Sequence, residues 1–211
     1  MSTLEKTKIN DVDLDKLIKN KLGLLSFYLN KEINATRKPF LPDKNFYQNL
    51  SSDNSSLRSM SNIILNYLNE PIDALQTHFV TNNSGHVITQ NGNTIPLQLN
   101  DAPGVYTKIK GEDTILMDQK YIKDSKKVVA ILAHEIMHYY LISRHNIIMT
   151  DKMENELLTD VATIYFGLGI LVVNGMTFQS TWFLSIIAFF LEFSIFQQPS
   201  QHLDTLNRLN M

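Results

Sequence analysis

Hydrophobic residues at helical spacing dominate the first third of the chain. Between residues 12 and 33 they recur every three or four positions, which predicts a helix over this range. Asp53 and the serines that follow it offer N-cap residues for a second helix, which is expected to run to about Asn69 and to stop before Pro71. Residues 1–70 are therefore expected to form a helical N-terminal part.

Short runs of alternating hydrophobic and polar residues come next, separated by turn signals that are rich in asparagine and glycine. Such runs are typical of short strands. They lie at 78–81, 86–90, 94–99, 105–109 and 114–117. The turn at Lys110 and Gly111 joins the last two runs into a predicted hairpin. The whole stretch, residues 78–118, is therefore expected to form a small antiparallel meander.

Two strongly hydrophobic helices are predicted after this sheet. Asp124 or Ser125 can cap the first helix, which is expected to end near Ile142. Asp151 is followed three residues later by Glu154, a capping-box pattern that marks the start of the second helix. Residues 124–167 are therefore expected to hold a pair of helices directly behind the predicted hairpin.

The last hydrophobic segment runs from Trp182 to Phe196. It spans fifteen residues and contains Glu192, whereas a membrane-crossing helix needs about 20 apolar residues. A buried terminal helix over residues 178–197 is therefore expected, packed on the preceding helices. The alternative is a surface that faces a membrane or a protein partner.

These elements predict an α+β fold that is mostly helical and forms a single domain over residues 1–211. A hydrophobic content of 44% and a charged content of 19% are typical of a globular protein. The length suits one hydrophobic core. A net charge of −2 gives no basic field of the kind that nucleic-acid binding requires.

Two absences from the sequence narrow the chemistry further. The chain has no cysteine, which excludes disulfides and cysteine-ligated zinc, so any metal ligand must be His, Asp or Glu. The N-terminal stretch MSTLEKTKINDVDLDK has no apolar segment and is not expected to be a signal peptide. A cytoplasmic protein is therefore expected.

The candidate chemistry is concentrated at residues 134–138, which read His-Glu-Ile-Met-His inside the first hydrophobic helix. His134 and His138 are four positions apart, so their β-carbons lie about 6 Å apart on one face. This spacing suits two ligands of one tetrahedral metal ion. Glu135 would then lie beside the metal, where a bound water waits. The alternative is a pair of core histidines with Glu135 at the surface.

A catalytic zinc usually takes three protein ligands, so one more acidic residue or histidine is needed. The second helix offers Glu154, Glu156 and Asp160. Glu154 already has a structural role at the helix start. Glu156 lies one turn before Asp160, and this pairing suits a metal ligand plus a carboxylate that accepts a ring N–H from a ligating histidine. A solvated Glu156 and a ligating Asp160 are the alternatives.

The residues HEIMH followed by ELLTD resemble the gluzincin metallopeptidases, the thermolysin-like class. The resemblance covers about forty residues, from Val128 to Gly167, so only a minimal zincin-like catalytic domain can be shared. It implies that His134, His138 and Glu156 hold zinc, that Glu135 is the general base, and that Asp160 buttresses a ligating histidine. It also implies that an edge strand at 105–109 aligns the substrate; an ordinary core hairpin is the alternative reading.

A zinc metallopeptidase is therefore expected, in which a metal-activated water attacks a peptide bond and Glu135 transfers the proton. The residues that could stabilise the oxyanion are Tyr106, Tyr139, Tyr165 and His145. Two other readings stay open: a non-catalytic zincin-fold protein that acts by binding a partner, and a metal-dependent hydrolase of a non-peptide amide. A protein partner could dock on the apolar C-terminal segment.

Overall fold

A computed structural model of the chain describes residues 11–29, 38–43, 45–51, 53–83, 86–88, 94–95 and 102–175. The helices are α1 (Asp11–Tyr28), α2 (Asn54–Tyr67), α3 (Ser125–Tyr139), α4 (Lys152–Tyr165) and α5 (Gly169–Gly175). The strands are β1 (Gln76–Asn83), β2 (His86–Ile88), β3 (Thr94–Ile95), β4 (Gly104–Ile109) and β5 (Glu112–Asp118). A 3-10 turn, η1 (Gln119–Tyr121), precedes α3, and a π-helical segment, η2 (Tyr140–Arg144), follows it.

The described strands form one sheet in the order β3-β2-β1-β5-β4. With the helices they make an α+β fold, as predicted. The expected all-antiparallel arrangement is wrong at one place, because β1 and β5 pair in parallel, with Gln76 opposite Thr114 and Val80 opposite Asp118. The other neighbouring pairs are antiparallel. The described sheet is therefore mixed, and β3 and β4 are its two edge strands.

The parallel pair includes β5, a strand that is covered on both of its faces. Strand β5 is buried almost continuously along its second half, which is typical of a central strand covered on both faces. Ile115 and Met117 belong to the main core, whereas Leu116 packs with Val80 on the opposite face. Alternation of hydrophobic and polar residues along a strand predicts which side chains share a face of the sheet. It does not predict whether the neighbouring strand runs parallel or antiparallel.

The hairpin of β4 and β5 forms as predicted, through a two-residue turn. Ile109 pairs with Glu112, so only Lys110 and Gly111 lie between the strands. Both residues have positive φ, 52° and 88°, as tight hairpin turns require. The turn sets the register that brings Gly104 opposite Met117, at the end of β4 that meets α3.

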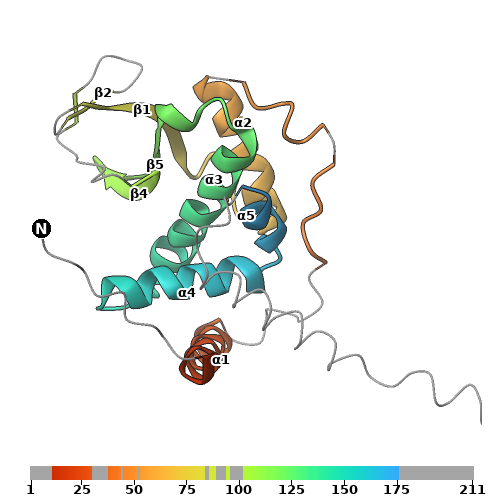
Figure 1. The fold of residues 1–211 in the computed structure, drawn as a ribbon. Helices are drawn as coiled ribbons and strands as arrows, with labels where there is room; N and C mark the ends of the chain where they lie inside the picture. Colours follow the sequence, from red (N-terminus) through yellow and green to blue (C-terminus); the bar gives the residue numbers. More distant parts are fainter. Residues whose placement is uncertain are drawn as a thin grey trace, which may run out of the picture.

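Helix α3 lies at the centre of the fold and contacts β4, β5, α2, α4 and α5 (Figure 1). Its N-cap is Asp124, whose side chain accepts a hydrogen bond from the Lys127 amide, as the sequence predicts. Most of its residues are buried, including Val129, Leu132 and Ile136. The helix was expected to end near Ile142; regular α-helix stops at Tyr139, and the chain continues in π-helical form as η2 to Arg144.

The other helices begin close to their predicted positions. Asp53 caps α2 and Asp151 caps α4, each by accepting a backbone N–H three residues on. Helix α1 covers most of the predicted range of 12–33, and residues 30–37 lie outside the described part of the chain. The predicted C-terminal helix over 178–197 also lies outside it.

Helix α1 packs beneath α4 (Figure 1). Lys21, which is 4% exposed, donates to Glu154 near the start of α4 at 3.2 Å. A buried lysine requires such a partner, so this contact ties the N-terminal helix to the helix that carries Glu156. Among the described residues, no single helix has the length and apolar character to cross a bilayer; α4 and α5, bent by 113°, reach that standard only as a pair.

Candidate metal centre

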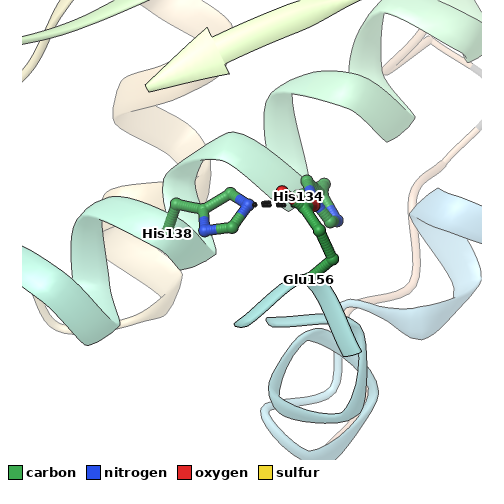
Figure 2. Close-up of side chains that lie close together, drawn as sticks. All are labelled: His134, His138 and Glu156. Carbon is green, nitrogen blue, oxygen red and sulfur yellow. Dashed lines mark hydrogen bonds and ion pairs between the residues drawn. The ribbon is translucent and has the colours of Figure 1, made fainter. Parts of the chain in front are cut away.

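The two histidines of the HEIMH sequence point to one place. They lie one turn apart on α3, and their ring planes are nearly perpendicular, with centroids 4.7 Å apart. The two Nε2 atoms are 3.1 Å from one another. Figure 2 shows both rings directed from α3 toward the side chain of Glu156. A helix supplies this convergence because side chains at positions i and i+4 share a face.

Glu156 completes the group from α4. Its Oε2 lies 3.1 Å from Nε2 of His134 and 3.4 Å from Nε2 of His138. Ligand atoms of a tetrahedral zinc lie about 3.3 Å apart when each metal–ligand bond is about 2.0–2.1 Å. The spacing of these three ligand atoms is therefore compatible with one bound metal ion. Glu156 is 42% exposed against 9% for His138, so the group opens to solvent on the side of Glu156.

The far nitrogens of both rings are also engaged. Nδ1 of His134 lies 2.8 Å from Oδ1 of Asp160, which is buried. Nδ1 of His138 lies 3.0 Å from the hydroxyl of Thr159. Such contacts hold a ligating histidine in the tautomer whose Nε2 faces the metal. Asp160 thus contacts the nitrogen of His134 that does not face Glu156. This is the position predicted for a carboxylate that supports a ligating histidine, and it differs from the position of a third metal ligand.

Two neutral imidazoles with hydrogens on Nδ1 would present bare Nε2 lone pairs to each other at 3.1 Å. This arrangement is repulsive unless a proton or a cation lies between them. Burial by itself would lower the pKa of His134, but the charge of Asp160 and the hydrogen bonds to Asp160 and Glu156 hold that pKa well above 6.5. Hydrogen bonds from both rings place the pKa of Glu156 far below 4.5. The group therefore favours positive charge at its centre.

Glu135 lies beside this group and is 7% exposed. The alternative that placed it at the surface is wrong. Its Oε2 accepts a hydrogen bond of 2.8 Å from the backbone N–H of Tyr106 on the edge strand β4. Gly104 makes this approach possible, because a β-carbon there would lie 2.5 Å from Cγ2 of Ile131 and 3.2 Å from Cγ of Glu135. Helix α3 and strand β4 are thus joined at the residue predicted to be the base.

The side chains of the remaining candidate residues have other partners. Glu154 lies at the predicted helix start, where its backbone N–H donates to Asp151, but its side chain pairs with Lys21 of α1. The hydroxyl of Tyr106 donates to Asp113 at 2.5 Å, and burial, together with this bond, raises its pKa. Tyr139 is 2% exposed, and its ring packs edge-on to that of Tyr106. Two further candidates for the oxyanion donor have aromatic neighbours: Tyr165 packs on Phe166 and His145 packs on Tyr140.

Sequence reasoning missed two residues of this centre, Thr159 and Gly104. Thr159 lies three positions after Glu156, which places both on one face of α4. That spacing could have drawn attention to it. Gly104 carried no signal beyond its place in a Pro-Gly turn, because close approach of a helix to a strand depends on tertiary packing.

No family model, no curated protein and no solved structure matches this chain. The class of protein therefore rests on the site itself, which comprises two histidines, two carboxylates and a threonine from α3 and α4, with a buried glutamate alongside.

Proposed function

We propose that this chain is a zinc-dependent metallopeptidase built on a minimal zincin-like domain of the gluzincin type. The observation that carries the proposal is the triangle formed by His134, His138 and Glu156, whose ligand atoms lie 3.1–3.4 Å apart. Asp160 beside His134 and Glu135 beside the triangle support it. Zinc would be held by the two Nε2 atoms and the Glu156 carboxylate.

Zinc in such a site supplies a Lewis acid that acidifies water and polarises a carbonyl group. Glu135 supplies the proton transfer. Its Oε2 is held by Tyr106, which fixes the carboxylate and leaves Oε1 to accept a proton from the attacking water. The same oxygen then delivers that proton to the leaving amine, as a general base and acid does in turn. Fixing the carboxylate beforehand reduces the entropic cost of this transfer.

The edge strand supports a peptide as the substrate. Strand β4 lies at one edge of the described sheet. Its Tyr106 N–H points away from β5 but already donates to Glu135, so a peptide would have to pair with other outward-facing main-chain groups of β4. An extended peptide can add to such an edge through main-chain hydrogen bonds. It would then run past Glu135, with its carbonyl groups close to the open side of the metal group.

Glu135→Gln tests the catalytic role directly. The amide oxygen can still accept the Tyr106 N–H, so folding and the contact between α3 and β4 should persist while the base is lost. We expect cleavage of a library of unstructured peptides to fall by about 10²–10⁴-fold, with zinc content unchanged. Equal cleavage by the parent and the variant would contradict the proposal. If the parent protein cleaves only small non-peptide amides, the substrate class in the proposal would change from peptides to such amides.

Metal analysis tests the site independently of activity. Purified parent protein should carry close to one equivalent of zinc, and His138→Ala should carry little. His145→Ala is the control, because His145 packs on Tyr140 and lies outside the group that fits a metal. Zinc retained by His138→Ala at the parent level would rule out this site.

A second candidate function is a non-catalytic protein that keeps the fold and acts by binding a partner. The hydrogen bond between Glu135 and Tyr106 favours it, because this bond gives Glu135 a structural role without any reaction. The Glu135→Gln variant separates the two functions. Biological function that survives the substitution, with no peptide cleavage by the parent, would support the binding protein.

A further inference from the structure

We propose that Thr159 is a positioning residue that sets the tautomer of His138 and thereby turns the lone pair of its Nε2 toward the metal position. The inference rests on the metal site of the proposed function and adds a residue to it. The hydroxyl of Thr159 lies 3.0 Å from Nδ1 of His138. It also lies 2.9 Å from the backbone carbonyl of Asn155, one turn earlier on α4.

The number of available protons decides the direction of these two bonds. A threonine hydroxyl has one hydrogen, and the Asn155 carbonyl can only accept. The hydroxyl therefore donates to Asn155 and can only accept from His138. In the neutral ring Nδ1 of His138 must then carry the single hydrogen, which leaves Nε2 bare, whereas the protonated ring carries a hydrogen on both nitrogens. Nε2 is the nitrogen that faces Glu156 and His134.

The surroundings of Thr159 make this assignment rigid. Thr159 is 0% exposed, so water has no access to replace the hydroxyl. A β-branched side chain in a helix has few rotamers, and the bond to Asn155 selects among them. The two ligating rings are thus supported in different ways. Asp160 supplies a charged acceptor to His134, whereas Thr159 supplies a neutral one to His138, which avoids a further negative charge beside Glu135 and Glu156.

The tautomer can be read in the metal-free protein. At alkaline pH, nitrogen-15 chemical shifts of the His138 ring should report hydrogen on Nδ1 in the parent and in Thr159→Ser. Thr159→Val keeps the shape but removes the acceptor, and the ring should then shift toward hydrogen on Nε2. Thr163→Val is the matched control. Thr163 is equally buried and donates to the Thr159 carbonyl at 2.8 Å, and the described contacts give it no histidine partner.

Zinc affinity gives a second readout, by competition with a chelator. Thr159→Val should bind zinc about 10–100-fold more weakly than the parent, as losses of such supporting contacts do. Thr159→Ser should recover most of the affinity, and Thr163→Val should retain it. Thermal unfolding of each variant identifies any that fails to fold, in which case Thr159→Ala takes the place of the valine variant in both measurements.

The possible results separate this inference from the proposed function. A parent that binds no zinc would overturn the metal site, and the metal-free tautomer would still decide the role of Thr159. A parent that binds zinc, with Thr159→Val equal to it in tautomer and affinity, would overturn the inference alone. Equal losses in Thr159→Val and Thr163→Val would also overturn it, because they would indicate a general effect on α4.

Discussion

In the candidate metal centre, each ring nitrogen of the two histidines has its own polar partner. His134 uses Nδ1 toward Asp160 and Nε2 toward Glu156, and His138 divides its two nitrogens between Thr159 and the same glutamate. Such complete pairing is what buried polar groups require. The exception is the contact between the two Nε2 atoms, which favours a cation. The charge that surrounds that contact is therefore the property to test at this scale.

Asp160→Asn isolates the charge of the buried carboxylate. The asparagine oxygen can still accept from Nδ1 of His134, so the ring should keep its orientation. Zinc affinity should nevertheless fall by about 10–100-fold, because the ligand becomes less basic. Competition with a chelator measures the change. Asp118→Asn removes another buried carboxylate, one that pairs with Lys120, and should leave zinc affinity unchanged; an equal fall in both variants would contradict the role of Asp160.

The elements could be predicted from the sequence more fully than their pairing. Caps at Asp53, Asp124 and Asp151 have local signals, and the structure confirms all three. The parallel contact of β1 with β5 has no local signal, because alternation along a strand is the same for both pairing directions and the partner is set by tertiary packing. The π-helical end of α3 was missed for a similar reason, since hydrophobic spacing changes little where a helix widens by one residue.

Some residues of the candidate site could likewise be predicted from the sequence, and others could not. His134, Glu135, His138, Glu156 and Asp160 could be singled out because their spacing on two helices is a local property. Thr159 could be placed on the correct face but not assigned a partner. Gly104 could not be found, because its role appears only when β4 lies against α3.

The close contact of β4 with α3 requires a residue without a β-carbon at position 104. A β-carbon there would meet Ile131 at 2.5 Å, and the branched side chain of isoleucine has little freedom to move. Gly104→Ala should therefore destabilise the fold by about 1–3 kcal/mol in urea unfolding and weaken the bond between Tyr106 and Glu135. Any peptidase activity should fall with it.

Gly23→Ala provides the control for this substitution. Gly23 lies within α1, and a β-carbon there meets nothing within 4 Å. Alanine should stabilise that helix by up to about 1 kcal/mol. If Gly104→Ala were also neutral or stabilising, the close approach of β4 to α3 would not be required.

For the whole molecule, the proposed metal centre couples stability to pH. The pKa of His134 is raised in the folded protein, so its contribution is present below 6.5 and is lost as pH rises through the folded value. The pKa of Glu156 is lowered, so its contribution is present above 4.5 and is lost as pH falls through the folded value. In metal-free protein both contributions are present between pH 4.5 and 6.5.

Thermal unfolding with a chelator should therefore show that the difference in Tm between the parent and His134→Gln shrinks as pH rises above that window. Zinc requires the ring to lose its proton, so zinc-loaded parent should instead gain stability, relative to metal-free parent, with rising pH. A difference between parent and His134→Gln that stays constant from pH 6 to pH 9 would contradict the raised pKa.

The short extent of the polar centre has a practical consequence for protein design. Its side chains come from two five-residue segments, 134–138 and 156–160, and the two further contacts use main-chain atoms, the N–H of Tyr106 and the carbonyl of Asn155. Main-chain groups can be supplied by residues of many types. Ten residues could therefore be grafted onto another pair of helices that meet in the same geometry, and they would carry the proposed metal ligands together with the groups that orient them.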